Sequence, residues 1–245
     1  MIDVTEVNEL SRAADPGGRT ELMLMLLSDA RLPTGAHAHS AGLEPALNSR
    51  MPTGDVPRYL QARLRTVTAV EAGAAVVARH LATEHGTTGA EVATGLRAVE
   101  AAWRARTISA AARLASQQLG RGYQRLVLRL WPQHRAASAL AELAAPCRAV
   151  VLGVAAACTG IGPAALARLI GYDEAQTICA AALKISPFDP VTATGWVLAA
   201  QPEIERLADV VGPLTRPDAI PAPAAPQMEQ WAEIHATTTQ RLFRA

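Results

Sequence analysis

The stretch LMLLSDARLPTGAHAHSAGLE, from Leu24 to Glu44, decides how the chain is interpreted. Its apolar first part stops at Pro33-Thr34-Gly35, and small residues with two histidines then lead into Ser40-Ala41-Gly42-Leu43-Glu44. Proline fixes the backbone angle φ, and glycine allows backbone angles that other residues avoid, so the stretch predicts a defined loop between two apolar helices. A generic helical bundle does not need residues in this order. The loop is therefore the first candidate functional segment.

The composition of the whole chain predicts an all-α fold. Half of the 245 residues are hydrophobic but only 4% are aromatic, so alanine, leucine and valine must fill the core, and alanine favours helix. No stretch alternates polar and apolar residues for long enough to build a sheet. We expect a single helical-bundle domain of about eight to ten helices.

Turn-forming residues divide the chain into four regions. We expect a flexible N-terminal arm over residues 1–20 and the helical domain over residues 21–211. Residues 212–226 contain five prolines and predict a Pro-rich linker that cannot be regular helix. Residues 227–245 predict a C-terminal docking segment carried by this linker, and packing of the segment on its own domain is an equally open interpretation.

The expected helices are set by apolar residues at helical spacing. They cover residues 21–27, 40–50, 55–85, 90–119, 120–131, 137–159, 163–170, 173–185, 191–199 and 203–211. Glycine and proline mark many of the boundaries. Asp55, for example, is the expected N-cap of a helix with Pro57 in its first turn.

Charge and apolar length argue against two large classes of function. The chain has 23 basic and 22 acidic residues, so its net charge indicates neither nucleic-acid nor membrane binding. The longest apolar stretch, from Ala149 to Cys158, is far shorter than the roughly 20 residues that span a bilayer. Three cysteines without a C-x-x-C pair, in a chain with no leader sequence, predict reduced thiols and a cytoplasmic location.

His37 and His39 are the obvious metal candidates, because residues two apart in an extended loop share a side. Two ligands are too few, and we favour polar loop residues that cap the next helix. A site shared across a dimer stays as the second interpretation. The sequence contains no G-x-S-x-G, H-E-x-x-H or phosphate-binding glycine loop, so we expect no enzyme activity, no catalytic residues, no bound metal and no cofactor.

The sequence between Glu100 and Glu142 contains no acidic residue but seven arginines. Arg121, Arg125 and Arg129 recur every four residues and share one face of a helix. They could bind an acidic partner or phosphates, although arginine is also the usual surface cation of this chain. A helical nucleic-acid-binding regulator that uses the Arg104–Arg135 stretch is the alternative function, but the sequence pI of about 7.8 and the few aromatic residues argue against it.

Lys184 is the chain's only lysine and follows the apolar run that ends at Leu183. A cation in the last turn of a helix is favoured by the helix dipole, which is a sufficient structural reason for it. Its retention as lysine where arginine is otherwise used suggests a second role.

Several separated blocks resemble the UreF family of urease accessory proteins, in the family's order. LLSDARLPTGAHAHSAGLE resembles the first family signature, and RLASQQLGRGYQRL resembles its "small-x-x-x-L-G-R" helix. The apolar helices that end in AALKISP resemble the third block, and QRLFRA resembles the family's last residues. The resemblance covers most of residues 22–245. The family's aromatic positions in the first block are His37 and His39 here.

The resemblance implies a non-catalytic, dimeric helical scaffold. It implies binding to UreD (also called UreH) and to the GTPase UreG, which the scaffold presents to the urease apoenzyme for nickel insertion. Candidate partner-binding residues come from the matched blocks, the histidines and the arginine face. They are Pro33, Gly35, His37, His39, Ser40, Gly42, Glu44, Arg121, Arg125, Lys184, Arg241, Leu242 and Phe243.

Overall fold

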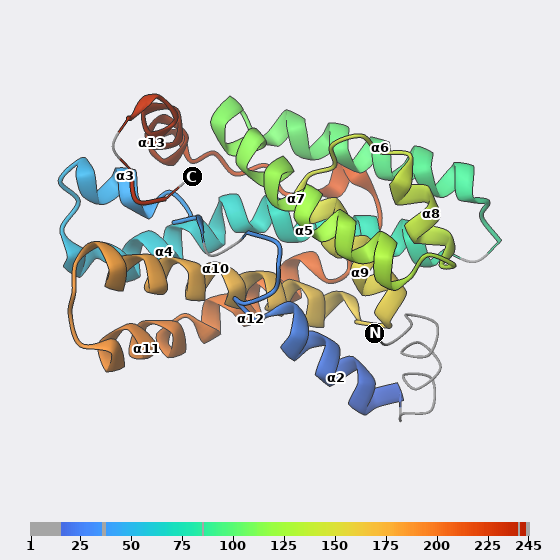
Figure 1. The fold of residues 1–245 in the computed structure, drawn as a ribbon, viewed down its shortest axis with the longest axis horizontal. Helices are drawn as coiled ribbons and strands as arrows, with labels where there is room; N and C mark the ends of the chain where they lie inside the picture. Colours follow the sequence, from blue (N-terminus) through green and yellow to red (C-terminus); the bar gives the residue numbers. More distant parts are fainter. Residues whose placement is uncertain (1–15, 36–37, 85, 240, 244–245) are drawn as a thin grey trace.

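A computed structural model describes residues 16–35, 38–84, 86–239 and 241–243 of the chain. Across those residues every regular element is a helix, which confirms the all-α prediction (Figure 1). The elements are α2 (Pro16–Leu27), α3 (Leu43–Asn48), η2 (Thr53–Asp55), α4 (Val56–Arg65), α5 (Val67–Thr83), α6 (Gly89–Arg106), α7 (Ala110–Leu130), α8 (Arg135–Ala141), α9 (Arg148–Thr159), α10 (Pro163–Ile185), α11 (Pro190–Ala199), α12 (Gln201–Val211), η3 (Pro217–Ala219) and α13 (Pro226–Thr237).

Helix α5 forms the centre of the bundle, with α6 and α7 on one side and α10 and α12 on the other (Figure 1). Its residues are mostly alanine and valine, and Ala72, Ala75 and Val77 are fully buried. Small side chains let helices approach closely, and a Cβ on Gly153 of α9 would overlap the carbonyl oxygen of Ala75. The alanine-rich core predicted from composition is therefore built around α5.

A second apolar cluster joins the first signature to the end of the chain. It contains Leu43 from α3, Leu60 from α4 and Ile178 from α10, together with Phe243. Helix α13 and the C-terminal residues lie beside α3 (Figure 1). The helix that follows the first signature is thus packed against the C-terminal residues.

The last five residues of the expected N-terminal arm, residues 16–20, are helical. Residues 1–15 lie outside the described residues, and residues 16–20 belong to α2. The helix therefore starts at Pro16, where we expected a turn at Pro16 to Gly18. Proline is well accommodated in the first turn of a helix, because its missing N–H would have no helical partner there.

Several helix predictions were wrong in their boundaries. We expected residues 90–131 to divide at Gly120, but α6 ends at Arg106 and α7 runs from Ala110 through Gly120 to Leu130. Residues 55–85 form α4 and α5, which are separated at Thr66 with φ −118° and ψ −92°. Residues 137–159 are divided into α8 and α9, and the division includes Pro146, which cannot donate a helical hydrogen bond. The two helices expected over residues 163–185 are one helix, α10, in which Gly171 gives room to Ile204 of α12.

The segment between α12 and α13 is extended, but it is not a free tether. Ile220 is buried, and its carbonyl oxygen accepts the Arg106 Nε–H at 2.9 Å. A second Arg106 nitrogen donates to the carbonyl oxygen of Asp218 at 3.1 Å. Pro221 also packs against Gly73 of α5. These contacts fix the segment on the helical domain.

No helix in the described ranges is both long enough and apolar enough to cross a membrane.

Candidate functional site

The loop before α3 takes the backbone form that its glycines predict. Gly35 and Gly42 have φ values of 85° and 73°, which side chains rarely allow. The Tyr59 hydroxyl donates to the carbonyl oxygen of Ala41 at 2.7 Å, and a Cβ on Gly42 would lie 2.9 Å from the Tyr59 hydroxyl oxygen. Ser40 accepts the Glu44 N–H at 3.3 Å. The signature thus places Glu44 at the start of α3 with its side chain facing inward.

The Glu44 site consists of Glu44, His235, Leu242 and Phe243. Glu44 Oε2 lies 3.0 Å from His235 Nε2 and accepts the Phe243 N–H at 3.0 Å, while Oε1 accepts the Leu242 N–H at 2.7 Å. The Glu44 side chain is only 5% exposed. A buried carboxylate needs such partners, because its charge has lost the hydration that water gave it. One carboxylate from the first signature therefore holds two segments from the end of the chain.

Leu242 faces solvent and its neighbour Phe243 faces the core. Phe243 is 5% exposed and lies in the second apolar cluster, whereas Leu242 is 70% exposed. The ammonium nitrogen of Lys184, in the last turn of α10, lies 5.3 Å from the centroid of the Phe243 ring. This distance allows a cation–π interaction. The third sequence block therefore meets the first block through the tail.

The second block meets the first at a close backbone contact. Gly122 is buried in α7, and a Cβ there would lie 2.6 Å from the carbonyl oxygen of Thr34. The Pro33-Thr34-Gly35 turn can pack against α7 only because this position has no side chain. All the sequence blocks that carry the family resemblance thus contribute to one connected region of the structure.

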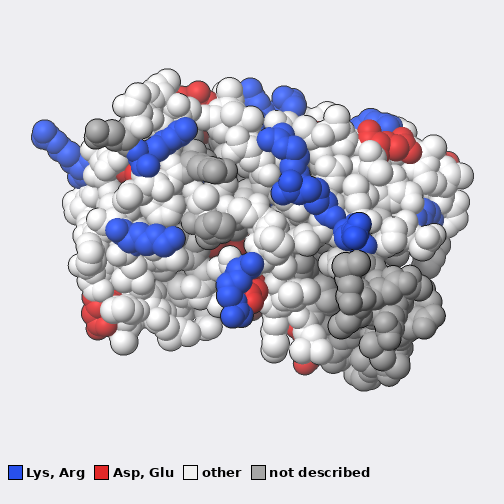
Figure 2. Space-filling model, in the orientation of Figure 1, with Lys and Arg blue, Asp and Glu red and all other residues white. Residues whose placement is uncertain are grey.

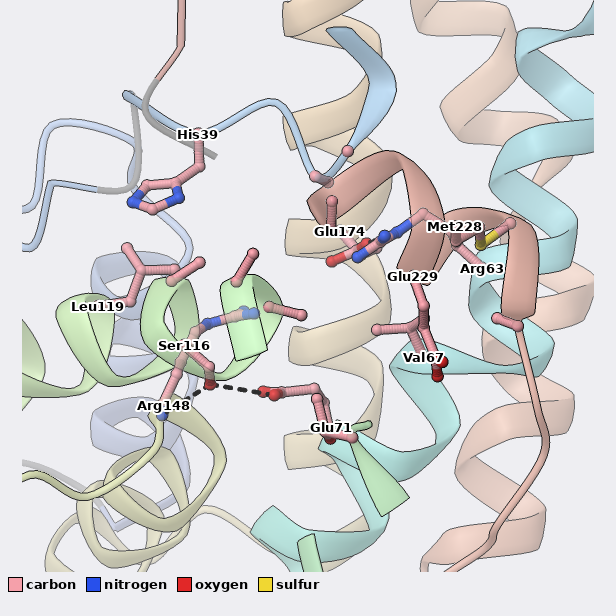
Figure 3. A pocket seen from close by; sticks show the side chains of 18 of the residues that line it. His39, Arg63, Val67, Glu71, Ser116, Leu119, Arg148, Glu174, Met228 and Glu229 are labelled. Carbon is pink, nitrogen blue, oxygen red and sulfur yellow. Dashed lines mark hydrogen bonds and ion pairs between the residues drawn. The ribbon is translucent and has the colours of Figure 1, made fainter. Parts of the chain in front are cut away.

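A cavity of about 290 Å³ lies next to this region, between α7, α10 and α13 (Figure 3). Ser116 donates to Glu71 Oε1 at 3.1 Å and accepts the Arg148 N–H at 3.2 Å. Trp103 Nε1 donates to the same Glu71 oxygen at 2.8 Å. Arg148 also pairs with Asp173 at 2.6 Å. The polar groups on this wall of the cavity are thus bonded to one another.

Burial affects the pKa of two carboxyl groups on the cavity wall, Glu71 and Asp173. It raises the pKa of the Glu71 carboxyl, against the opposing effects of Arg148 and of the hydrogen bonds from Trp103 and Ser116. It also raises the pKa of the Asp173 carboxyl, and Arg148 again opposes the shift. Each carboxyl has a basic neighbour that favours its charged form. This pairing is typical of a structural network that orders helices.

Of the two loop histidines, the structure describes only His39. His37 lies outside the described residues. His39 is buried and lies on the cavity wall (Figure 3). In the described part of the chain, no three His, Cys, Asp or Glu side chains are grouped so as to hold a metal ion.

The basic stretch does not form one surface. Arg106 binds the segment after α12, Arg113 donates to the carbonyl oxygen of Thr107, and Arg135 donates to that of Thr87. Arg121 and Arg125, by contrast, lie exposed on the outer face of α7. The stretch from Arg104 to Arg135 therefore gives no support to the nucleic-acid alternative.

Sequence reasoning missed His235 and Tyr59. His235 stands in the tail with no motif around it, and Tyr59 lies on a helix whose pattern looks ordinary. The signal that could have found them was Glu44, because a carboxylate that starts an apolar helix and becomes buried must find donors. The sequence did not show that Glu44 is buried.

Comparisons with known proteins relate this chain to urease accessory proteins. The UreF family model matches residues 53–201. A urease accessory protein UreF from Mycolicibacterium vanbaalenii is 34% identical over 187 residues, which cover 76% of this chain and 82% of that protein. One from Mycobacterium tuberculosis is 36% identical over 178 residues, which cover 70% and 76%. The family-model match includes Arg121, Arg125 and Lys184, whereas Glu44 and the tail lie outside it.

Proposed function

The chain belongs to the UreF family of urease accessory proteins, and from that premise we propose that it is a scaffold for urease maturation. In this proposal it binds UreD (UreH) and the GTPase UreG and presents them to the urease apoenzyme for nickel insertion. It performs no chemistry of its own. The role in urease maturation follows the names of its relatives, and the partners follow the family resemblance.

The observation that carries the proposal is the Glu44 site. Three hydrogen-bonding contacts to one carboxylate join α3 to α13 and to the end of the chain. The result is a preorganised surface made of segments that are distant in sequence, which is what a protein that positions other proteins requires. Preorganisation favours binding because less conformational entropy is lost on association.

Leu242 is the residue that we propose contacts UreD. It is largely exposed beside the buried Phe243, so the tail presents an apolar side chain from a fixed backbone. An apolar side chain on a fixed backbone can be buried by a partner with little further loss of conformational entropy. Arg241, which lies next to it on the cavity rim, would supply a charged contact at the edge of the same surface.

The proposal includes a homodimer in the cytoplasm. The dimer follows the family resemblance, and light scattering on the purified chain would measure it. The described structure has Cys147, Cys158 and Cys179 as free thiols. A reducing compartment would keep them so.

Co-purification tests the proposed binding. The full chain is expressed with UreD and UreG from the same organism, each alone and both together, and complexes are isolated by size exclusion. We expect a stable complex with UreD and a larger complex when UreG is added. Elution of the chain apart from both proteins would contradict the scaffold role.

A further inference from the structure

The outer face of α7 carries an unusual line of side chains. Leu114, Gln118, Arg121, Arg125 and Arg129 follow one another at spacings of three or four residues. With about 100° of rotation per residue, all five lie within an arc of about 80° on the helix. Figure 2 shows basic side chains in a row across the surface over α7. We call Arg121, Arg125 and Arg129 the arginine row.

The arginine row differs from most other exposed arginines of the described chain, although Arg50 and Arg104 are also without an ion pair there. Many of those are paired with a carboxylate, as in Arg31–Asp29, Arg58–Asp55, Arg97–Glu142, Arg168–Glu205 and Arg216–Asp218. Within the described residues, the arginine row has no ion pair of this kind. Like charges one helical turn apart repel one another, so the arrangement has an electrostatic cost.

The surroundings of α7 explain why these charges stay uncompensated. Helix α7 packs on α8, α9 and α13. Helices α8 and α9 contain no acidic residue. Of the two acidic residues of α13, Glu233 is bonded to Ser109 and Ala111 at the opposite end of α7, and Glu229 lines the cavity at the Leu114 end. Arg129 lies in the last turn, where the helix dipole favours a cation, but Arg121 and Arg125 lie too far from that end.

An exposed apolar residue continues the same line. Leu114 is 52% exposed and, with Gln118, lines the cavity beside α13. The face therefore offers one apolar contact at its cavity end and three guanidinium groups along the rest of its length. The buried side of α7, which includes Gly122, is already fixed against the Thr34 turn. A ligand on the outer face would meet a rigid helix.

From this arrangement we propose that the outer face of α7 binds an acidic amphipathic helix of a protein partner. Carboxylates one helical turn apart on that helix pair with the arginine row, and an apolar side chain at its other end packs on Leu114. Guanidinium groups suit carboxylates because they can form two parallel hydrogen bonds. The inference rests on the proposed function, in which the partner is one of the urease maturation proteins.

A protein helix fits this face better than a nucleic acid does. Nucleic-acid binders combine many cations with exposed aromatic side chains on which bases stack. The row supplies only three cations. Of the neighbouring aromatic residues, Tyr123 is buried and Trp131 is partly buried against the core. An apolar contact at Leu114 also has no use in binding phosphates.

The test measures binding of the full chain to UreD, UreG and the urease apoenzyme separately, at low and high salt. The first variant is R121E/R125E/R129E, and L114S removes the apolar contact. The matched control is R58E/R97E/R216E, which makes the same charge change at exposed positions on other elements. A single-stranded DNA oligonucleotide serves as the competing ligand, and circular dichroism confirms folding.

We expect one partner to bind the row variant at least about tenfold more weakly and with less salt dependence, and the control to bind as the unmodified chain does. L114S should weaken the same partner. Unchanged affinity of the row variant for every partner would overturn the inference but leave the scaffold role intact. Failure of the unmodified chain to bind any partner would overturn both. Tight DNA binding that depends on the row and ignores L114S would replace the inference.

Discussion

Glu44 and Phe243 are 199 positions apart in the chain, and the Glu44 carboxylate accepts the Phe243 N–H at 3.0 Å. The bond joins the first sequence signature to the last. It also gives Glu44 of the first signature a structural role, which is to hold the end of the chain. The loop positions the carboxylate, and the carboxylate holds the surface that we propose binds the partner.

Replacing Glu44 should therefore destabilise the protein. Glu44→Ala leaves His235 and two backbone N–H groups without their acceptor in a buried place, and we expect a loss of about 2–4 kcal/mol in the free energy of unfolding. Urea unfolding followed by circular dichroism measures the loss. The control Glu84→Ala changes an exposed glutamate and should stay within about 0.5 kcal/mol. Equal stabilities of the two variants would contradict the role given to Glu44.

Two neighbouring substitutions should separate binding from folding. Leu242→Ala removes an exposed side chain and should weaken UreD binding with little change in melting temperature. Phe243→Ala empties a buried position and should cost about 3–5 kcal/mol of stability. Deleting residues 227–245 cannot make this distinction, because it also removes His235 from the Glu44 site. Full UreD affinity of Leu242→Ala would remove this residue from the proposed interface.

Two helical glycines should respond in opposite ways to alanine. In Gly122→Ala the new Cβ would lie 2.6 Å from the Thr34 carbonyl oxygen, a backbone atom that cannot move aside freely, so we expect a loss of about 1–3 kcal/mol. Gly195 of α11 has open space at this position, and Gly195→Ala should stabilise by about 0.5–1 kcal/mol. Thermal unfolding of both variants measures the difference. A tolerated Gly122→Ala would show that the Thr34 turn is not tightly packed on α7.

The contact between α13 and the start of α7 should depend on pH. Hydrogen bonds from the Ser109 hydroxyl and then the Ala111 N–H hold the pKa of the Glu233 carboxyl below its ordinary value of 4.5. A lowered pKa means that the ionised contact contributes stability above pH 4.5 and that this contribution is lost as the pH falls through the lowered value. The Ala111 amide resonance should report a midpoint below 4.5. In Ser109→Ala the midpoint should rise, and an unchanged midpoint would contradict the assignment.

The fold class could be predicted because composition and helical spacing are local properties of the sequence. The boundaries failed where tertiary contacts decide them. Nothing in the apolar pattern marks the break at Thr66. Gly171 lies between the two helices that we expected, but it is a buried position inside α10 against which Ile204 packs. The break before α9 could have been predicted from the sequence, because Pro146 lies inside the helix expected over residues 137–159.

The candidate site was only partly predictable for a related reason. The first signature, Lys184 and Phe243 could be named from sequence blocks, but no block shows that they meet. His235 became visible only when the fold brought it to the buried Glu44 carboxylate. The arginines between Glu100 and Glu142 were counted together, although neighbours such as Arg106 turn inward to carbonyl oxygens. Which side chain faces solvent is set by packing, and sequence spacing alone does not reveal it.

The most direct test of the scaffold role is urease activation. Urease apoenzyme from the same organism is incubated with UreD, UreG, nickel and GTP, with and without this chain, and urea hydrolysis is measured. The proposal predicts nickel-dependent activity with the chain present and its loss when the chain is omitted. Equal activation without the chain would contradict the proposed function.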